Sequence, residues 1–105
     1  MRRVAIAFAL AAVLVAACSS APWPKTAGET TCSEWSTEMT SGQRETLGGA
    51  MLLALRASHG GTVAPKEPVI KAFVTAIGDT CKQNPDAKIS TVGATLYNLS
   101  KDLQP

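Results

Sequence analysis

Few side chains in this 105-residue sequence can do acid–base or nucleophilic chemistry. The single histidine, His59, follows a predicted helix, and a cation is favoured near the C-terminus of a helix. We find no glycine-rich phosphate loop, no paired-carboxylate motif and no cluster of residues spaced as metal ligands. The sequence therefore predicts no enzymatic activity, no cofactor and no metal. An enzyme is the last of three alternatives, and it would need His59 in a tight cleft with carboxylates.

The chain also lacks a strong excess of charge of either sign. It contains 10 Lys and Arg against 8 Asp and Glu. Arg2 and Arg3 lie in a segment that we expect to be removed, which leaves eight basic and eight acidic residues. A balanced chain does not neutralise a row of phosphates, so we expect no nucleic-acid partner.

No apolar run in the sequence is long enough to cross a bilayer. Residues 4–17 are apolar without interruption, but a membrane-spanning helix needs about 20 residues. A short apolar run that follows Arg2 and Arg3 and ends in small residues is typical of a secretory signal peptide. Val15-Ala16-Ala17-Cys18 resembles the bacterial lipobox, which implies cleavage before Cys18 and a diacylglycerol on its sulfur. The alternative is an ordinary signal peptide followed by a stray cysteine.

Lipidation of Cys18 predicts a protein of the bacterial cell envelope, anchored to the outer face of the cell membrane. Two or three acyl chains hold a protein to a bilayer stably. Residues 18–30 have no hydrophobic period and are rich in Ser, Thr, Pro and Gly, which predicts a flexible tether that reaches about 20 Å. Within this tether, Trp23 would lie at the bilayer interface or be exposed to solvent. The predicted parts are a signal peptide over 1–17, this tether, and a folded domain over 31–105.

Cysteine is scarce, with three residues in the chain. With Cys18 taken by the lipid, Cys32 and Cys81 remain, and an oxidising compartment favours a disulfide between them. Metal binding by two cysteines without a nearby histidine is the weaker alternative. The bond would close a loop of about 50 residues and contribute about 4 kcal/mol through chain entropy. A domain of about 75 residues has a thin core and benefits from such a cross-link.

Helical spacing of apolar residues begins at Thr31, and we see no strand and no internal repeat. Thr31-Cys32-Ser33-Glu34 and Thr40-Ser41-Gly42-Gln43 both fit capping boxes, in which the Thr side chain and the fourth residue bind each other's backbone N–H. These motifs predict a short helix over about 32–38 and a longer one over about 41–58. Gly60 and Gly61 end the longer helix, because glycine takes the left-handed C-cap conformation at little cost.

Two more helices complete an all-α domain of four helices, one short and three longer. Glu67-Pro68 starts one of them, since proline is tolerated in the first turn, and Asn84-Pro85-Asp86 ends it. Ser90 is expected to cap the last helix, over about 91–103. The expected core stripes of the three long helices are Leu47, Met51, Ala54, Leu55 and Ser58; Val69, Ile70, Phe73, Val74, Ile77 and Cys81; and Val92, Leu96, Leu99 and Leu103.

Two adjacent glycines lie inside the predicted helix over 41–58. Gly48 and Gly49 each cost about 1 kcal/mol there relative to alanine. We expect them to allow close packing against a neighbouring helix or a local kink, and a flexible point is the alternative.

The opening of the domain resembles the HdeA family of small periplasmic acid-stress chaperones. Thr31, Cys32, Glu34 and Trp35 match the Thr-Cys, acidic and aromatic opening of that family, and Cys81 matches its second disulfide-bonded cysteine. The resemblance covers about residues 31–103 and implies a compact helical fold. The chain departs from the family in its lipid anchor, its balanced charge and its short loop before the Phe73 helix.

The resemblance also implies a function and a mechanism. Acid protonates the carboxylates, the domain becomes strongly positive, and self-repulsion exposes apolar helix faces that bind unfolded client proteins. The disulfide would limit the opening. In this hypothesis the domain acts as a monomer or as a homodimer. The alternative is an envelope binding or structural module that holds a protein partner or a lipophilic ligand between its helices. The candidate acid switches are Glu34, Glu38, Glu45, Glu67, Asp79, Asp86 and Asp102, and the candidate client surfaces lie around Leu55 and Phe73, which are plain core in the simpler interpretation.

Overall fold

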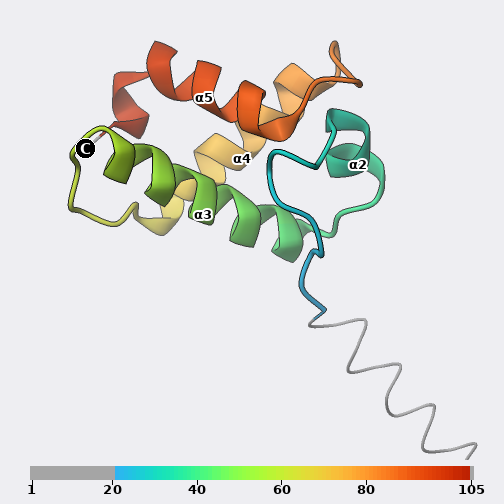
Figure 1. The fold of residues 1–105 in the computed structure, drawn as a ribbon, viewed down its shortest axis with the longest axis horizontal. Helices are drawn as coiled ribbons and strands as arrows, with labels where there is room; N and C mark the ends of the chain where they lie inside the picture. The colour runs from blue at the N-terminus through green and yellow to red at the C-terminus, as the bar shows by residue number, and fades with distance from the viewer. Residues whose placement is uncertain (1–20, 105) are drawn as a thin grey trace, which may run out of the picture.

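The computed structural model describes residues 21–104, which fold into four α-helices and one short 3-10 helix (Figure 1). α3 and α5 lie along two sides of the molecule, and α4 crosses behind them. The all-α prediction is confirmed. The predicted signal peptide and Cys18 lie outside the described residues, and no helix within 21–104 is long and apolar enough to cross a membrane. The elements are α2 (Cys32–Thr37), α3 (Ser41–Ser58), α4 (Glu67–Cys81), α5 (Ile89–Leu99) and η1 (Lys101–Leu103).

Both predicted capping boxes are present. The Thr31 hydroxyl accepts from the Glu34 N–H at 3.1 Å, and the Glu34 carboxylate accepts from the Thr31 N–H at 3.0 Å. Thr40 and Gln43 repeat the arrangement at the start of α3, at 3.1 and 2.9 Å. α3 therefore has the predicted bounds, and Gly60, which follows the C-cap residue, has the expected positive φ of 85°.

The prediction for the start of α5 was wrong. α5 begins at Ile89 rather than at residue 91, and its N-cap is Lys88, which makes no side-chain capping bond. The first N–H groups of a helix need acceptors from outside the helix. Here the Ile89 N–H donates to the Thr30 carbonyl at 2.8 Å, and the Ser90 N–H donates to the Ala27 carbonyl at 3.2 Å. A distant segment of the chain thus caps α5 in place of the Ser90 side chain.

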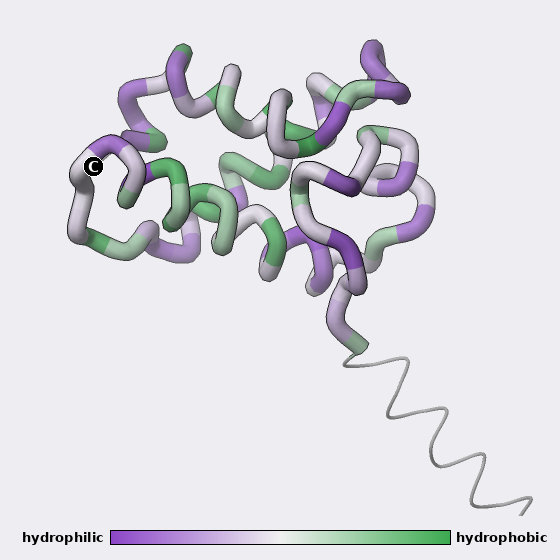
Figure 2. The backbone as a smooth tube through the Cα atoms, viewed as in Figure 1, coloured by the Kyte–Doolittle hydropathy of each residue, from purple (hydrophilic) through white to green (hydrophobic). Residues whose placement is uncertain are grey.

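The core contains residues from all four helices. Along each helix in Figure 2, apolar segments alternate with polar ones, as expected when one side faces the core. The buried apolar residues are Cys32, Trp35, Met39, Met51, Leu52, Phe73, Ile77, Cys81, Ile89, Val92, Tyr97 and Leu103.

Two of the predicted core stripes need correction. On α3 the buried residues are Gly48, Met51, Leu52 and Arg56, whereas Ala54 and Ser58 are exposed. The stripe is rotated because α3 packs against both α4 and α5.

On α5 the predicted core residue Leu99 is 79% exposed, and Tyr97 is buried instead. Tyr97 lies four residues after buried Gly93 and shares its face, whereas Leu99 lies six residues after Gly93, about 120° away around the helix.

The glycines of α3 allow close packing, as predicted. A Cβ on Gly48 would lie 2.7 Å from Val74 Cγ2, and one on Gly49 would lie 3.3 Å from Ile70 Cδ1. The close approach of α3 and α4 therefore requires glycine at position 48. Gly93 of α5 also lies at a close helix contact, since a Cβ there would meet the flexible end of Met51 and lie 3.2 Å from Phe73 Cζ; the sequence analysis did not identify it.

Candidate functional site

The predicted disulfide joins Cys32 at the start of α2 to Cys81 at the end of α4. The two Cα atoms are 4.9 Å apart, and both residues are buried. Trp35, one turn after Cys32, is only 1% exposed. The short helix α2 is thus attached to the core by a covalent bond and a large aromatic side chain.

Residues 21–30, which we call the N-terminal strap, fold against the domain. The Trp23 indole N–H donates to the Thr30 hydroxyl at 2.8 Å, and Thr30 is completely buried. Gln43 of α3 donates to the Ala21 carbonyl at 3.1 Å. Trp23 is half-buried against the core. The packed part of the chain therefore begins well before the expected boundary at Thr31.

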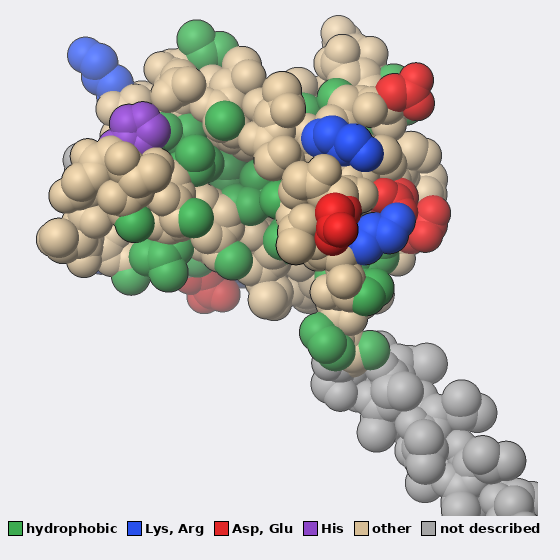
Figure 3. Space-filling model, in the orientation of Figure 1, with side chains coloured by type: hydrophobic (Ala, Val, Ile, Leu, Met, Phe, Trp, Pro, Cys, Tyr) green, Lys and Arg blue, Asp and Glu red, His purple; other side chains and the backbone are tan. Residues whose placement is uncertain are grey.

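One carboxylate links the strap to α2. Lys25 of the strap pairs with Glu34, whose side chain is 16% exposed and also completes the capping box of α2. The Lys25 ammonium, and then the Thr31 N–H, hold the pKa of the Glu34 carboxyl below its ordinary value of 4.5. The same ion pair raises the pKa of Lys25 above its ordinary value of 10.5. Figure 3 shows acidic and basic side chains side by side at this end of the molecule.

A second carboxylate of the strap, Glu29, was missed by the sequence analysis. It accepts from the Thr26 N–H at 3.1 Å and from the Thr26 hydroxyl at 3.2 Å. The backbone bond, followed by the hydroxyl bond, lowers the pKa of Glu29 below 4.5. The signal was present in the sequence, because Thr26 and Glu29 have the same three-residue spacing as the two capping boxes.

The other six candidate acid switches are not brought together. Asp79 lies 3.6 Å from Lys82 in an exposed pair on α4. Glu45 is half-buried on α3, and the remaining four are exposed on separate elements. Of the seven candidates, Glu34 pairs with Lys25 of the strap; this pairing, with a smaller contribution from the charge of Glu38, raises the pKa of Lys25. The four exposed residues are Glu38, Glu67, Asp86 and Asp102.

The two candidate client surfaces differ in accessibility. Phe73 lies on α4 and is completely buried, whereas Leu55 lies on α3 and is half-buried at the edge of the core. A client protein reaches Phe73 only if the helices separate. The hypothesis that these residues bind clients therefore requires a loosened state of the domain.

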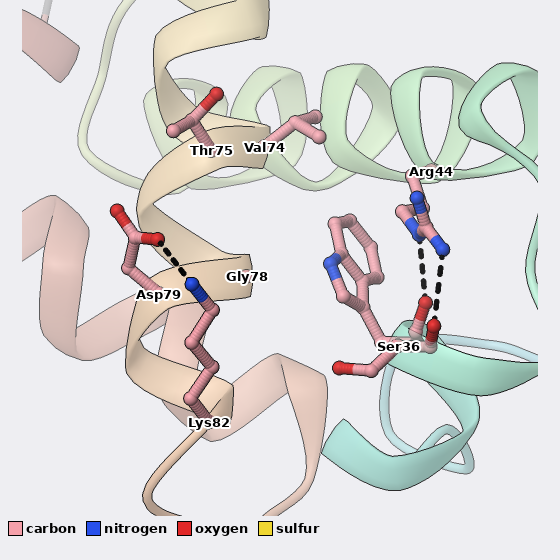
Figure 4. A pocket seen from close by; sticks show the side chains of 8 residues that line it. Ser36, Arg44, Val74, Thr75, Gly78, Asp79 and Lys82 are labelled. Carbon is pink, nitrogen blue, oxygen red and sulfur yellow. Dashed lines mark hydrogen bonds and ion pairs between the residues drawn. The ribbon is translucent and has the colours of Figure 1, made fainter.

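A groove of about 440 Å³ lies where α2, α3 and α4 meet (Figure 4). Arg44 spans one side of it, with Nε donating to the Trp35 carbonyl at 2.7 Å and Nη2 to the Ser36 carbonyl at 3.3 Å. The sequence analysis did not identify this groove, because its walls come from three helices. Its lining residues are Trp35, Ser36, Arg44, Val74, Thr75, Gly78, Asp79 and Lys82.

His59 is the C-cap of α3, where the sequence analysis placed a cation. Its Nδ1 is 2.9 Å from the Leu55 carbonyl, and its ring centroid is 5.0 Å from that of Tyr97. The ring is exposed and belongs neither to the strap nor to the groove. Over residues 21–104, no group of three or more His, Cys, Asp or Glu side chains is placed to hold a metal ion.

A buried arginine was also missed by the sequence analysis. Arg56 is 7% exposed, and it donates to the Leu103 carbonyl at 2.9 Å and to the Val63 carbonyl at 3.3 Å. It therefore ties α3 to η1 and to the loop before α4. Its position four residues after Leu52, on the buried face, was the available signal.

Comparison of the chain with known protein families, characterised proteins and solved structures finds no match.

Proposed function

We propose that this chain is a lipoprotein of the bacterial cell envelope, anchored through Cys18, and that its domain is a non-enzymatic, acid-responsive chaperone like those of the HdeA family. The observation that carries the acid response is the double role of Glu34. This carboxylate caps α2 beside Cys32 and pairs with Lys25 of the strap. Protonation weakens both interactions at once.

The charge balance supports the same response. The described residues contain eight Lys and Arg and all eight Asp and Glu of the chain. Complete protonation of the carboxylates leaves eight positive charges on a small domain, which then repels itself. Because hydrogen bonds lower the pKa of Glu34 and Glu29, the pairing of Glu34 with Lys25 and the turn that Glu29 closes within the strap persist until the pH falls below 4.5.

The position of the disulfide explains how such a domain would loosen without losing all structure. Release of the strap removes the acceptors of the Ile89 and Ser90 N–H groups, so α5 loses its cap. Apolar residues beneath it, such as Phe73, then become reachable. The bond between Cys32 and Cys81 keeps α2 and α4 together.

An acid aggregation assay tests this proposal. The oxidised chain from Ser19 onward is mixed with an aggregation-prone protein, and the pH is lowered to about 2 to 3, where carboxylates are protonated. Light scattering should fall with added domain and recover when the disulfide is reduced. A domain in excess that leaves scattering unchanged would reject the chaperone activity and leave the fold and the anchor untouched.

The groove beside Trp35 favours a second candidate function, an envelope module that binds a lipophilic ligand. Its volume lies in the range of small-molecule sites, and Trp35, Val74 and Gly78 contribute apolar surface to its lining. Thermal-shift screening with amphiphilic ligands tests this function. A ligand that stabilises the parent domain but not Thr75→Trp, which fills the groove, would support it.

A further inference from the structure

We infer that the lipid on Cys18 holds the domain directly against the bilayer, with the start of the strap and the first turn of α3 facing the lipid headgroups. The inference rests on the lipidation of Cys18 proposed above and names the surface that the anchored domain contacts. It differs from the tether expected from composition, which would let the domain move freely above the membrane.

The number of residues between Cys18 and the folded chain limits the distance between the bilayer and the domain. Three peptide units separate Cys18 from Ala21, whose carbonyl is bonded to Gln43 of α3. Three fully extended residues span at most about 11 Å. A free segment over 19–30 would instead reach roughly 20 Å on average and about 40 Å when extended.

The strap cannot lengthen this distance without breaking contacts of the domain itself. Trp23 is bonded to buried Thr30, and Lys25 is paired with Glu34. The carbonyls of Ala27 and Thr30 cap α5, and their loss would leave helix N–H groups without acceptors. The strap is therefore a structural part of the domain, so the bilayer lies close to its first residues.

The surface at this end suits a headgroup layer. Pro22 and Pro24 are exposed beside half-buried Trp23, and the neighbouring residues of α3, Ser41 and Gly42, are exposed and uncharged. Figure 3 shows hydrophobic side chains where the described chain begins. The apolar segment 21–24, with its tryptophan, is favoured at a membrane–water interface, and Lys25, which pairs with Glu34, directly follows it. The loop between α3 and α4 lies at the opposite end of the molecule and points away from the bilayer (Figure 1).

Energy transfer from tryptophan to labelled lipids tests the inference. The chain from Cys18 onward is oxidised, so that Cys32 and Cys81 are joined, and the Cys18 thiol is coupled to a maleimide phospholipid. The vesicles contain phosphatidylethanolamine and phosphatidylglycerol with a small fraction of dansyl headgroups. Trp23 lies in the strap and Trp35 lies in α2, five residues after the strap ends, and both serve as donors.

The decisive variant carries a flexible insertion between Ser20 and Ala21. An insertion of about twelve residues adds roughly 20 Å of reach, so transfer should fall several-fold. The matched control carries the same insertion between Thr62 and Val63, in the loop at the far end, and should keep the transfer of the parent. Equal transfer in the parent and in the variant extended before Ala21 would overturn the inference.

Because Cys18 is coupled chemically to a phospholipid, the energy-transfer test does not depend on whether cells lipidate Cys18. Mass spectrometry of the protein purified from cell envelopes shows whether Cys18 carries a diacylglycerol. If it does not, the proposed anchor fails, and the coupled chain still measures whether the strap holds the domain at a lipid surface.

Discussion

At the scale of single residues, Glu34 combines two structural roles, since it completes the capping box of α2 and pairs with the strap. Its carboxylate accepts from the Thr31 N–H, and it pairs with Lys25. Because its folded pKa is lowered from 4.5, these interactions stabilise the fold above about pH 4.5. Their contribution is lost as the pH falls through the folded pKa.

Replacing Glu34 should therefore change the pH dependence of stability. Glu34→Gln keeps an amide oxygen for the Thr31 N–H but removes the charge that pairs with Lys25. We expect a lower Tm than the parent at pH 7, and the difference should shrink as the pH falls below 4.5 and through the lowered folded pKa of Glu34. Thermal unfolding followed by circular dichroism from pH 7 to 3 measures this. Asp86→Asn, at an exposed turn position, is the control, and an identical effect there would contradict the role of Glu34.

Gly48 supplies a second prediction at this scale. In Gly48→Ala the new methyl would meet the stiff, β-branched Val74 at 2.7 Å. The strain should exceed the gain in helix propensity and lower the free energy of unfolding by about 1–2 kcal/mol. Gly42→Ala, which meets only the Thr40 hydroxyl at 4.0 Å, should be neutral or stabilising. Urea unfolding of both variants compares them directly, and equal stabilities would argue against close α3–α4 packing.

At the scale of elements, the strap and α5 depend on each other. The strap supplies the carbonyls of Ala27 and Thr30, and α5 supplies the N–H groups of Ile89 and Ser90. The single β-bridge among the described residues, between Thr31 and Lys88, continues the same pairing. A segment with the composition of a linker is in this way part of the cap of a helix.

Removal of the strap should expose the start of α5. A chain that begins at Thr31 loses both acceptors, so hydrogen exchange at Ile89 and Ser90 should accelerate strongly. The Val69 N–H donates to the Lys66 carbonyl at the start of its own helix α4, at 3.0 Å, and should exchange at the parent rate. Exchange followed by mass spectrometry or NMR compares the two sites. Unchanged protection of Ile89 would mean that the strap does not cap α5.

At the scale of the whole molecule, one disulfide and a small hydrophobic core together stabilise the packing of the four helices. Cys32 and Cys81 are 49 residues apart in sequence, and they join an element of six residues to the central helix α4. A domain of this size has a total stability of about 5–15 kcal/mol. A cross-link worth about 4 kcal/mol is a large fraction of that total.

The paired substitution Cys32→Ser and Cys81→Ser tests this contribution without leaving a free thiol. We expect the free energy of unfolding to fall by about 4 kcal/mol at neutral pH. In acid, the oxidised parent should keep much of its helical signal and bind a hydrophobic dye, whereas the variant should lose the signal. Urea titration and circular dichroism provide the two measurements. A variant as stable as the parent would show that packing around Trp35 is sufficient.

The sequence by itself determined the features that depend on neighbours along the chain. A capping box operates across three residues, so Thr31 with Glu34 and Thr40 with Gln43 predicted where α2 and α3 begin. The disulfide could also be predicted from the sequence, because the assignment of Cys18 to the lipid left Cys32 and Cys81 as a single pair of cysteines.

The tertiary structure decided what depends on partners far apart in the chain. α5 begins at Ile89 because Thr30, 59 residues earlier, accepts its first N–H. The spacing of residues near Ile89 does not reveal a hydrogen bond to Thr30. The sequence therefore predicted a cap at Ser90. The same reason applies to the choice of Tyr97 over Leu99 and to the burial of Arg56, since each depends on which helix faces which. The strap shows this most clearly: its composition is that of a linker, and only its contacts with α2, α3 and α5 make it part of the folded domain.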